Sequence, residues 1–240
     1  SDNTGVGHSA LEANTTGASN TALGKNSLAA NTTGARNVAV GMNVLATNTT
    51  AANNTAVGYE ALKANTTGAA NVAVGRQALF ANTTASDNTA LGHQALNVNL
   101  TGANNVAVGT AALASNTTAS NNTAVGVSSM ISNTTGAANT SVGQQAGGAV
   151  TTGSNNICIG VAAGNHDGAI VTGGQNTMIG NYTDTNATDA DSVNTFGYNV
   201  TGTEGYTTIG VGADDIRAAH GNITWATVSD ERYKKDIVDS

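Results

Sequence analysis

Short apolar segments alternate with polar, turn-forming segments at a regular spacing along most of the chain. In one representative unit, Val72 and Val74 lie on one face of an extended segment because side chains alternate with a two-residue period, while Ala73 faces the other way. Gly75 follows them and permits a sharp corner. Each unit is therefore predicted to contribute one short strand that ends at a glycine.

These units recur with a constant period of about 17 residues, the sequence signature of a repeat architecture. An asparagine stands four positions before each corner glycine, and a second asparagine series marks the turn. The members include Gly24, Gly41, Gly58 and Gly75 at the corner, Asn20, Asn37, Asn54 and Asn71 before the strand, and Asn31, Asn48 and Asn65 in the turn. Repetition this regular indicates an architecture in which each unit packs on its neighbours.

A helical solenoid is the first alternative, because the turns end alternately in Gly and Ala and create a super-period of about 34 residues, the length of a helix-pair repeat. Each unit, however, contains Asn-Thr-Thr followed by Gly or Ala, a second Asn and a corner Gly. This leaves no uninterrupted stretch of about 10 residues for a packed helix. The second half of the unit, such as residues 60–64, suits one helical turn as well as a short strand, and its conformation stays open.

The predicted fold is all-β, a parallel β-solenoid or β-roll in which equivalent residues of successive rungs lie about 4.8 Å apart. Stacked asparagines are expected to hydrogen-bond to the asparagines above and below. The leucine series that contains Leu62 and the Val or Leu before each glycine are expected to fill the interior. That interior is thin for the length of chain that each rung must order, so we expect further burial in a homotrimeric fibre, with the alanine series of Ala73 on the face of close approach.

Composition restricts the classes of protein to consider. Charged residues make up 10% of the chain and proline is absent, whereas disordered chains usually carry abundant charge and proline. A packed repeat is therefore a better interpretation than a disordered chain. The net charge of -7 and the lack of a basic stripe argue against a nucleic-acid partner. The single Cys158 excludes an internal disulfide framework, and no motif for a metal or another cofactor is found. No apolar run reaches the roughly 20 residues that span a bilayer, so membrane insertion is not expected.

The regular repeat covers residues 1–160, which we interpret as a solenoid shaft. Because a repeat is already under way at Asn3 and no Met precedes it, we take the chain to begin inside a longer polypeptide. The next matching segment begins at Asn176, whereas the regular period counted from Asn156 would place it at Gly173. An inserted loop is therefore expected to leave the rungs intact. Residues 161–204 are expected to form an irregular extension of the solenoid, in which the repeat dissolves from Asn181 onward.

Within this extension, Asp184, Asp189 and Asp191 lack the spacing of a calcium-binding loop, so a solvated loop is the better interpretation. Residues 205–228 are expected to form the strands of a short neck. Residues 229–240 are interpreted as the start of a C-terminal junction.

The most specific motif lies in this last segment, which reads Ser229-Asp-Glu-Arg-Tyr-Lys-Lys-Asp-Ile237. It resembles the junction, in bacteriophage tail fibres and tailspikes, between the fibre and a C-terminal intramolecular chaperone that trimerises the chain and cuts itself off. The Asn-Thr-Ala-Val-Gly repeats also resemble those of such fibres, and they are similar to the head β-rolls of trimeric autotransporter adhesins. The resemblance covers nearly the whole chain.

The resemblance implies that Ser229 attacks the peptide bond after Val228 with Lys234 as its base, a single-turnover self-cleavage. A hydroxyl needs a neighbouring base, and a desolvated lysine with a lowered pKa can serve. No other enzymatic activity is expected. Taken without the resemblance, the same residues are typical of an exposed helix start that Ser229 caps. The resemblance further implies a virion-tail, extracellular location, other virion tail proteins as partners, and a host cell-surface glycan or protein as receptor.

Two other functions stay open. A bacterial trimeric adhesin would carry a membrane-anchor barrel downstream in place of the chaperone. An ice-binding solenoid would use the regular threonine series of Thr15, Thr32, Thr49, Thr66 and Thr83. Receptor binding is expected at the irregular stretch 161–205, or beyond the fragment, and not along the uniform rungs.

Overall fold

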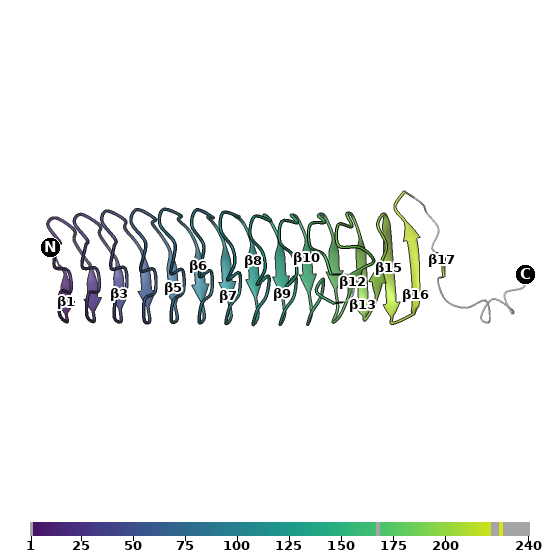
Figure 1. Cartoon of the computed structure of the whole chain (residues 1–240), viewed down its shortest axis with the longest axis horizontal. Helices are drawn as coiled ribbons and strands as arrows, with labels where there is room; N and C mark the ends of the chain where they lie inside the picture. Colours follow the sequence, from purple (N-terminus) through teal and green to yellow (C-terminus); the bar gives the residue numbers. More distant parts are fainter. Residues whose placement is uncertain (1, 167–168, 222–225, 228–240) are drawn as a thin grey trace, which may run out of the picture.

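The chain folds into a stack of rungs that runs from one end of the molecule to the other (Figure 1). The computed structural model describes residues 2–166, 169–221 and 226–227. These residues form strands and turns without any helix, and the stack is a parallel β-solenoid of about 12 turns with repeats of about 17 residues. The predicted all-β solenoid is confirmed. In the described part of the chain, no helix is long and apolar enough to span a membrane.

Each rung contributes one strand to a single long sheet, whose strands follow one another in chain order. They are β1 (Thr4–Val6), β2 (Thr21–Leu23), β3 (Val38–Val40), β4 (Thr55–Val57), β5 (Val72–Val74), β6 (Thr89–Leu91), β7 (Val106–Val108), β8 (Thr123–Val125), β9 (Thr140–Val142), β10 (Ile157–Ile159), β11 (Thr177–Ile179), β13 (Asn194–Tyr198), β15 (Tyr206–Val211), β16 (Asp214–Ala219) and β17 (Ala226–Thr227). Two short strands, β12 (Asp184–Thr185) and β14 (Thr201–Gly202), pair in a second sheet. The pairing is parallel up to β15, and β16 and β17 then pair antiparallel, so the strand direction reverses only at the C-terminal end of the sheet.

The register advances by one repeat from strand to strand. Ala56 pairs with Ala73, and Ala73 pairs with Ala90. At the predicted insertion, Ile157 of β10 pairs in parallel with Thr177 of β11. The extra residues therefore leave the rungs intact, as the sequence predicted.

The repeat also continues beyond Asn181, and the prediction that it dissolves there is wrong. Strand β13 pairs in parallel with β11, with Asn194 opposite Thr177, and β15 pairs in parallel with β13. The sequence hides this rung because Val193 stands where the asparagine before the strand is expected. The backbone preserves the register nonetheless, since the Val193 amide donates to Asn176 Oδ1 at 2.9 Å, as an asparagine amide would.

The second half of each rung, which the sequence left open, is a chain of turns and neither a strand nor a helical turn. Two residues in it adopt left-handed backbone conformations, such as Glu60 at φ 57° and Leu62 at φ 49°. Non-glycine residues in this region cost on the order of 1 kcal/mol each. Bonds between rungs stabilise the conformation, because the Leu62 amide donates to the Ala78 carbonyl at 3.0 Å and other amides of this limb bond likewise.

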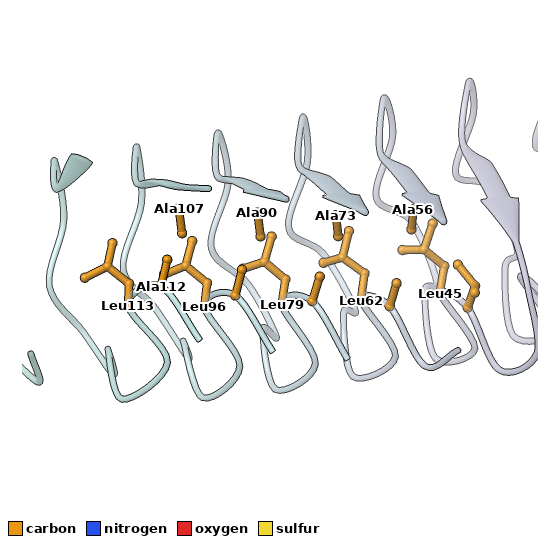
Figure 2. Close-up of a cluster of buried hydrophobic side chains, with 14 of the residues drawn as sticks. Leu45, Ala56, Leu62, Ala73, Leu79, Ala90, Leu96, Ala107, Ala112 and Leu113 are labelled. Atoms are coloured by element: carbon orange, nitrogen blue, oxygen red, sulfur yellow. The ribbon is translucent and has the colours of Figure 1, made fainter. Parts of the chain in front are cut away.

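The interior of the regular rungs is built from alanine and leucine columns. Figure 2 shows the strand alanines, such as Ala73 and Ala90, facing the leucines of the second limb, such as Leu79 and Leu96. All four side chains are fully buried. The interior role of the leucines is confirmed, but the predicted orientation of the strands is reversed: alanine faces inward, and the Val or Leu before the corner glycine faces outward. A leucine opposite leaves room for only a methyl group on the strand, which explains the inversion.

The interior changes composition near the C-terminal end. The turn asparagine column ends at Asn133, and the equivalent positions of the next two rungs hold Val150 and Ile170, which are fully buried. They pack in one cluster with Cys158 and Met178, which occupy the strand position that alanine fills elsewhere. The second cluster therefore has larger side chains than the shaft.

Candidate functional site

The predicted asparagine ladders form, and each uses a different set of atoms. In the turn column, every side chain donates to the one before it: Asn48 Nδ2 lies 2.8 Å from Asn31 Oδ1, and Asn65 Nδ2 lies 3.0 Å from Asn48 Oδ1. The same amide nitrogen also donates to a carbonyl of its own turn, that of Gly68 for Asn65. The turn ladder therefore closes each turn and ties it to its neighbour.

The asparagines before the strands bond through the backbone. The Asn37 amide donates to Asn20 Oδ1 at 2.9 Å, and the Asn54 amide donates to Asn37 Oδ1 at 3.0 Å. The side-chain nitrogen of Asn54 crosses the rung to the Gly68 carbonyl at 2.9 Å. These side chains are fully buried, as the members Asn20, Asn37, Asn54 and Asn71 show. Both asparagine series are structural and leave no donor or acceptor aimed at solvent.

The corner glycines are required by geometry. Gly24, Gly41, Gly58 and Gly75 have φ values between 126° and 142°, like the rest of their series. A Cβ on Gly75 would lie 2.5 Å from the carbonyl oxygen of the next corner, Gly92. No side chain fits that position, so the predicted structural role of these glycines is confirmed.

The predicted cleavage pair, Ser229 and Lys234, lies outside the described residues, as does the whole of 229–240. The self-cleavage therefore stays a prediction from the resemblance.

Within the predicted neck of 205–228, β15 is a further rung of the solenoid and β16 folds back on it.

The larger side chains of the strands gather on one exposed surface. We call this surface the outer face and define it by two columns of outward-facing residues on strands β1 to β11, β13 and β15. The first column is Thr4, Thr21, Val38, Thr55, Val72, Thr89, Val106, Thr123, Thr140, Ile157, Thr177, Asn194 and Thr207, and the second is Val6, Leu23, Val40, Val57, Val74, Leu91, Val108, Val125, Val142, Ile159, Ile179, Phe196 and Ile209. Every member is exposed or half-buried, and none carries a charge.

The outer face is long, and one of its two columns is entirely apolar. At about 4.8 Å per rung its thirteen strands extend over roughly 60 Å, and the two columns lie about 7 Å apart. Its second column consists entirely of Val, Leu, Ile and Phe, and Ile216 on β16 extends the apolar surface beyond Ile209. A patch of this size is on the order of the largest exposed apolar patches of monomeric proteins, which commonly mark interaction sites.

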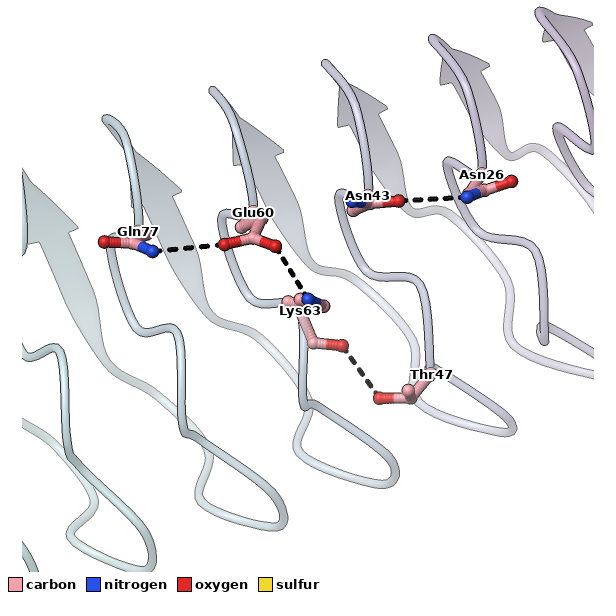
Figure 3. A network of polar contacts seen from close by, with 6 residues as sticks. All are labelled: Asn26, Asn43, Thr47, Glu60, Lys63 and Gln77. Carbon is pink, nitrogen blue, oxygen red and sulfur yellow. Dashed lines mark hydrogen bonds and ion pairs between the residues drawn. The ribbon is translucent and has the colours of Figure 1, made fainter.

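Polar side chains occupy the edge next to the outer face. In Figure 3, Gln77 and Lys63 both approach Glu60, and Asn26 bonds to Asn43 one rung on. Lys63 Nζ lies 2.6 Å from Glu60 Oε1, and Gln77 Nε2 lies 3.1 Å from Oε2. The bond from Lys63 is the main reason that the pKa of the Glu60 carboxyl is lowered, and the bond from Gln77 adds to it. This edge is a polar, hydrogen-bonded border.

Near the C-terminal end, aromatic rings replace the amides along this edge. Tyr182 stands two positions after Gly180, the same position that Gln77 holds after Gly75. Its ring lies edge-on to that of His166, with centroids 5.3 Å apart, and to that of Tyr198, with centroids 6.0 Å apart. Sequence reasoning missed this group because its members lie in separate units of the sequence and meet only when the rungs stack.

Asp184 lies in the paired strand β12, so the solvated-loop interpretation is wrong for this residue. Asp184 is buried and accepts from the His166 and Thr185 amides, at 2.8 and 3.0 Å, and Asp191 accepts from the Gly174 amide. Among the described residues, no group of three or more His, Cys, Asp or Glu could hold a metal ion. Burial raises the pKa of the Cys158 thiol to about 12, which keeps it protonated.

No protein-family model, curated protein or solved structure matches the chain.

Proposed function

We propose that this chain is the shaft of a trimeric attachment fibre of a bacteriophage tail, in which three copies associate through their outer faces. The outer face is the observation that carries the proposal. A chain that kept this surface in water would leave an exposed or half-buried Val, Leu, Ile or Phe side chain on every rung, at a cost of about 25 cal/mol per Å² of apolar area. Covering it with sister copies removes that cost along the whole length.

The shape of the solenoid supports a role as a spacer and presenting element. The rungs extend in one direction and the polar ladders are internal, so each rung is held mainly by its neighbours. Residues 229–237 resemble the junction with a C-terminal chaperone. This resemblance supports a phage-tail fibre whose chains are trimerised by a chaperone at the C-terminal end. The same resemblance implies that Ser229 cleaves the peptide bond after Val228 with Lys234 as its base.

The ice-binding alternative receives less support from the threonine columns. Oγ1 of Thr32, Thr49 and Thr66 donates to the carbonyl one rung on, at 3.0 to 3.2 Å, so these hydroxyl protons are engaged within the protein. Each of these hydroxyls has a single proton, so it offers only acceptor lone pairs to the water of an ice lattice.

The test is the oligomeric state of the chain and of two outer-face variants, Val74→Lys and Val108→Lys. Both positions are exposed or half-buried in the single chain, so a lysine there leaves the rungs intact and places a charge on the proposed interface. Thr67→Lys on an exposed turn of the same stack is the matched control. Sedimentation velocity should give a trimer for the wild type and the control and a monomer for the two valine variants.

A wild-type monomer, or valine variants that stay trimeric, would refute association through the outer face. A full reading frame that encodes a membrane-anchor barrel after residue 240 would transfer the proposal to the bacterial adhesins. Intact mass of the protein expressed from that reading frame, and of its Ser229→Ala variant, tests the cleavage. The wild-type chains should end at Val228, and the chains of the variant should stay uncut.

A further inference from the structure

One group of side chains is unlike the rest of the solenoid surface. The chain holds five tyrosines and one tryptophan in 240 residues, and Tyr59 of the regular rungs has no ring neighbour within its own column. At the C-terminal end, Tyr182 and Tyr198 come from successive rungs and their rings meet, and the His166 ring also contacts that of Tyr182. The rings are nearly perpendicular, at 88° between the tyrosines and 66° at the histidine.

These rings are open to solvent. Tyr198 is 53% exposed and Tyr182 is half-buried. An aromatic edge that stays exposed on a polar border is an apolar surface with polar tips, the type of surface that stacks against a ligand and keeps its hydroxyls in water.

The backbone holds the two tyrosines in fixed positions. The Tyr182 amide donates to the Val161 carbonyl at 2.9 Å, and the Tyr198 carbonyl accepts from the Gly212 amide at 2.8 Å. Between them, the Asn199 amide donates to the Asn181 carbonyl at 2.9 Å. Because both residues belong to hydrogen-bonded rungs, their backbone positions are fixed before a ligand binds, which lowers the ordering cost of binding.

The surroundings select the chemistry of the ligand. Exposed Asn181 and Asn199 stand directly beside the tyrosines in the sequence and offer uncharged amides, although Asn181 Oδ1 already accepts the Val161 amide at 2.9 Å. Neutral amides next to aromatic faces match a ring that has an aliphatic C–H face and hydroxyl groups at its rim.

We propose that Tyr182 and Tyr198, with His166 and the flanking Asn181 and Asn199, form a binding surface for a neutral sugar ring of a polysaccharide. The inference rests on the proposed attachment function and names the chemical class of the receptor. A protein receptor is disfavoured because stable protein interfaces bury about 800 Å² on each partner, far more than two or three rings provide. The position agrees with the prediction that binding lies within 161–205.

Single substitutions test the surface without breaking the solenoid, whereas deletion of 181–204 would remove the rung that contains β13. Ala162 occupies the position of Tyr182 in the preceding rung with φ 52°, so Tyr182→Ala fits the same backbone. Tyr198→Ala removes the second ring and Tyr198→Phe keeps it. Tyr59→Ala, which removes an exposed tyrosine from a regular rung, is the matched control.

The probe is a printed array of bacterial surface polysaccharides, read with the full chain and followed by biolayer interferometry on the polysaccharide that binds. Tyr182→Ala and Tyr198→Ala should each weaken binding about tenfold or more, which corresponds to about 1.4 kcal/mol. Tyr198→Phe and Tyr59→Ala should bind as the wild type does. Sedimentation of the same samples reports their oligomeric state.

A trimer that binds no arrayed polysaccharide, or that binds one equally well without the two rings, overturns the carbohydrate surface and leaves the proposed fibre standing. Equal losses in Tyr59→Ala also overturn it, since binding would then depend on tyrosines in general. A monomeric wild type refutes the proposed function by a separate measurement.

Discussion

The regular shaft and the C-terminal rungs keep one register with two different interiors. In the shaft between Asn20 and Asn116, each rung buries a strand alanine, a leucine and two hydrogen-bonded asparagines. Beyond Asn133, the turn asparagine gives way to Val150 and Ile170, and the strand alanine becomes Cys158 or Met178. The parallel backbone ladder is continuous across the change. The backbone bonds and the corner glycines therefore set the rung, and the side chains inside it can be polar or apolar.

The difference also shows what ends a buried ladder. Asn133 Oδ1 is buried and has no hydrogen-bond partner, because the next residue in its column is Val150. The column of asparagines before the strands ends without an unpaired acceptor, since Asn176 Oδ1 accepts the Val193 amide. A ladder that uses the backbone as donor can stop at any residue, whereas a ladder of side chains leaves one acceptor unpaired at its end.

The largest effect is expected where both regions depend on the same feature, the corner glycine. Gly75→Ala should cost about 3 kcal/mol or more, because the residue has φ 136° and the new Cβ would meet the Gly92 carbonyl. Gly212→Ala in the C-terminal hairpin should cost about 1 kcal/mol, since that residue has φ 60° with nothing near its Cβ. Chemical denaturation measures both, and similar losses would contradict the close approach of rungs at the corner.

An intermediate effect should separate the middle of the asparagine ladder from its end. Asn82→Val removes a donor to Asn65 and an acceptor for Asn99, so it should cost about 2 to 3 kcal/mol. Asn133→Val moves the end of the ladder by one rung and should cost about half as much, because Asn133 Oδ1 has no bond to lose. Equal free energies of unfolding for the two variants would show that the ladder contributes rung by rung without any effect of its end.

The smallest effect concerns the polar edge of the shaft and its pH dependence. Because Lys63 and then Gln77 lower the pKa of Glu60 in the folded chain, the stabilisation is present above the ordinary carboxyl pKa and is lost as the pH falls through the lowered value. The wild type should therefore lose more stability than Glu60→Gln between neutral pH and about pH 3, and the difference should be less than about 1 kcal/mol. Thermal unfolding at both pH values measures it. Parallel pH profiles for the variant and the wild type would refute the linkage. Tyr182, at the equivalent position of a C-terminal rung, offers no such group.

Sequence reasoning predicted the repeat length, the strands, the corner glycines and both asparagine ladders. It predicted the wrong face for the strand valines, because a short strand of Val-Ala-Val has the same alternation whichever side faces inward. It also missed the rung of β13, where Val193 and Thr195 replace the asparagine and alanine that mark the others. Periodicity detects identical residues, and the backbone register does not require them.

The sequence by itself determined the period of this protein and the residues that stack, since corner geometry admits only glycine and buried amides need partners above and below. The tertiary structure alone decided which side of the strand faces inward and which distant residues meet on the surface. The first depends on the space left by the leucines of the second limb, and the second depends on how the insertion before β11 aligns the rungs. Both are properties of packing between segments, which no single repeat contains.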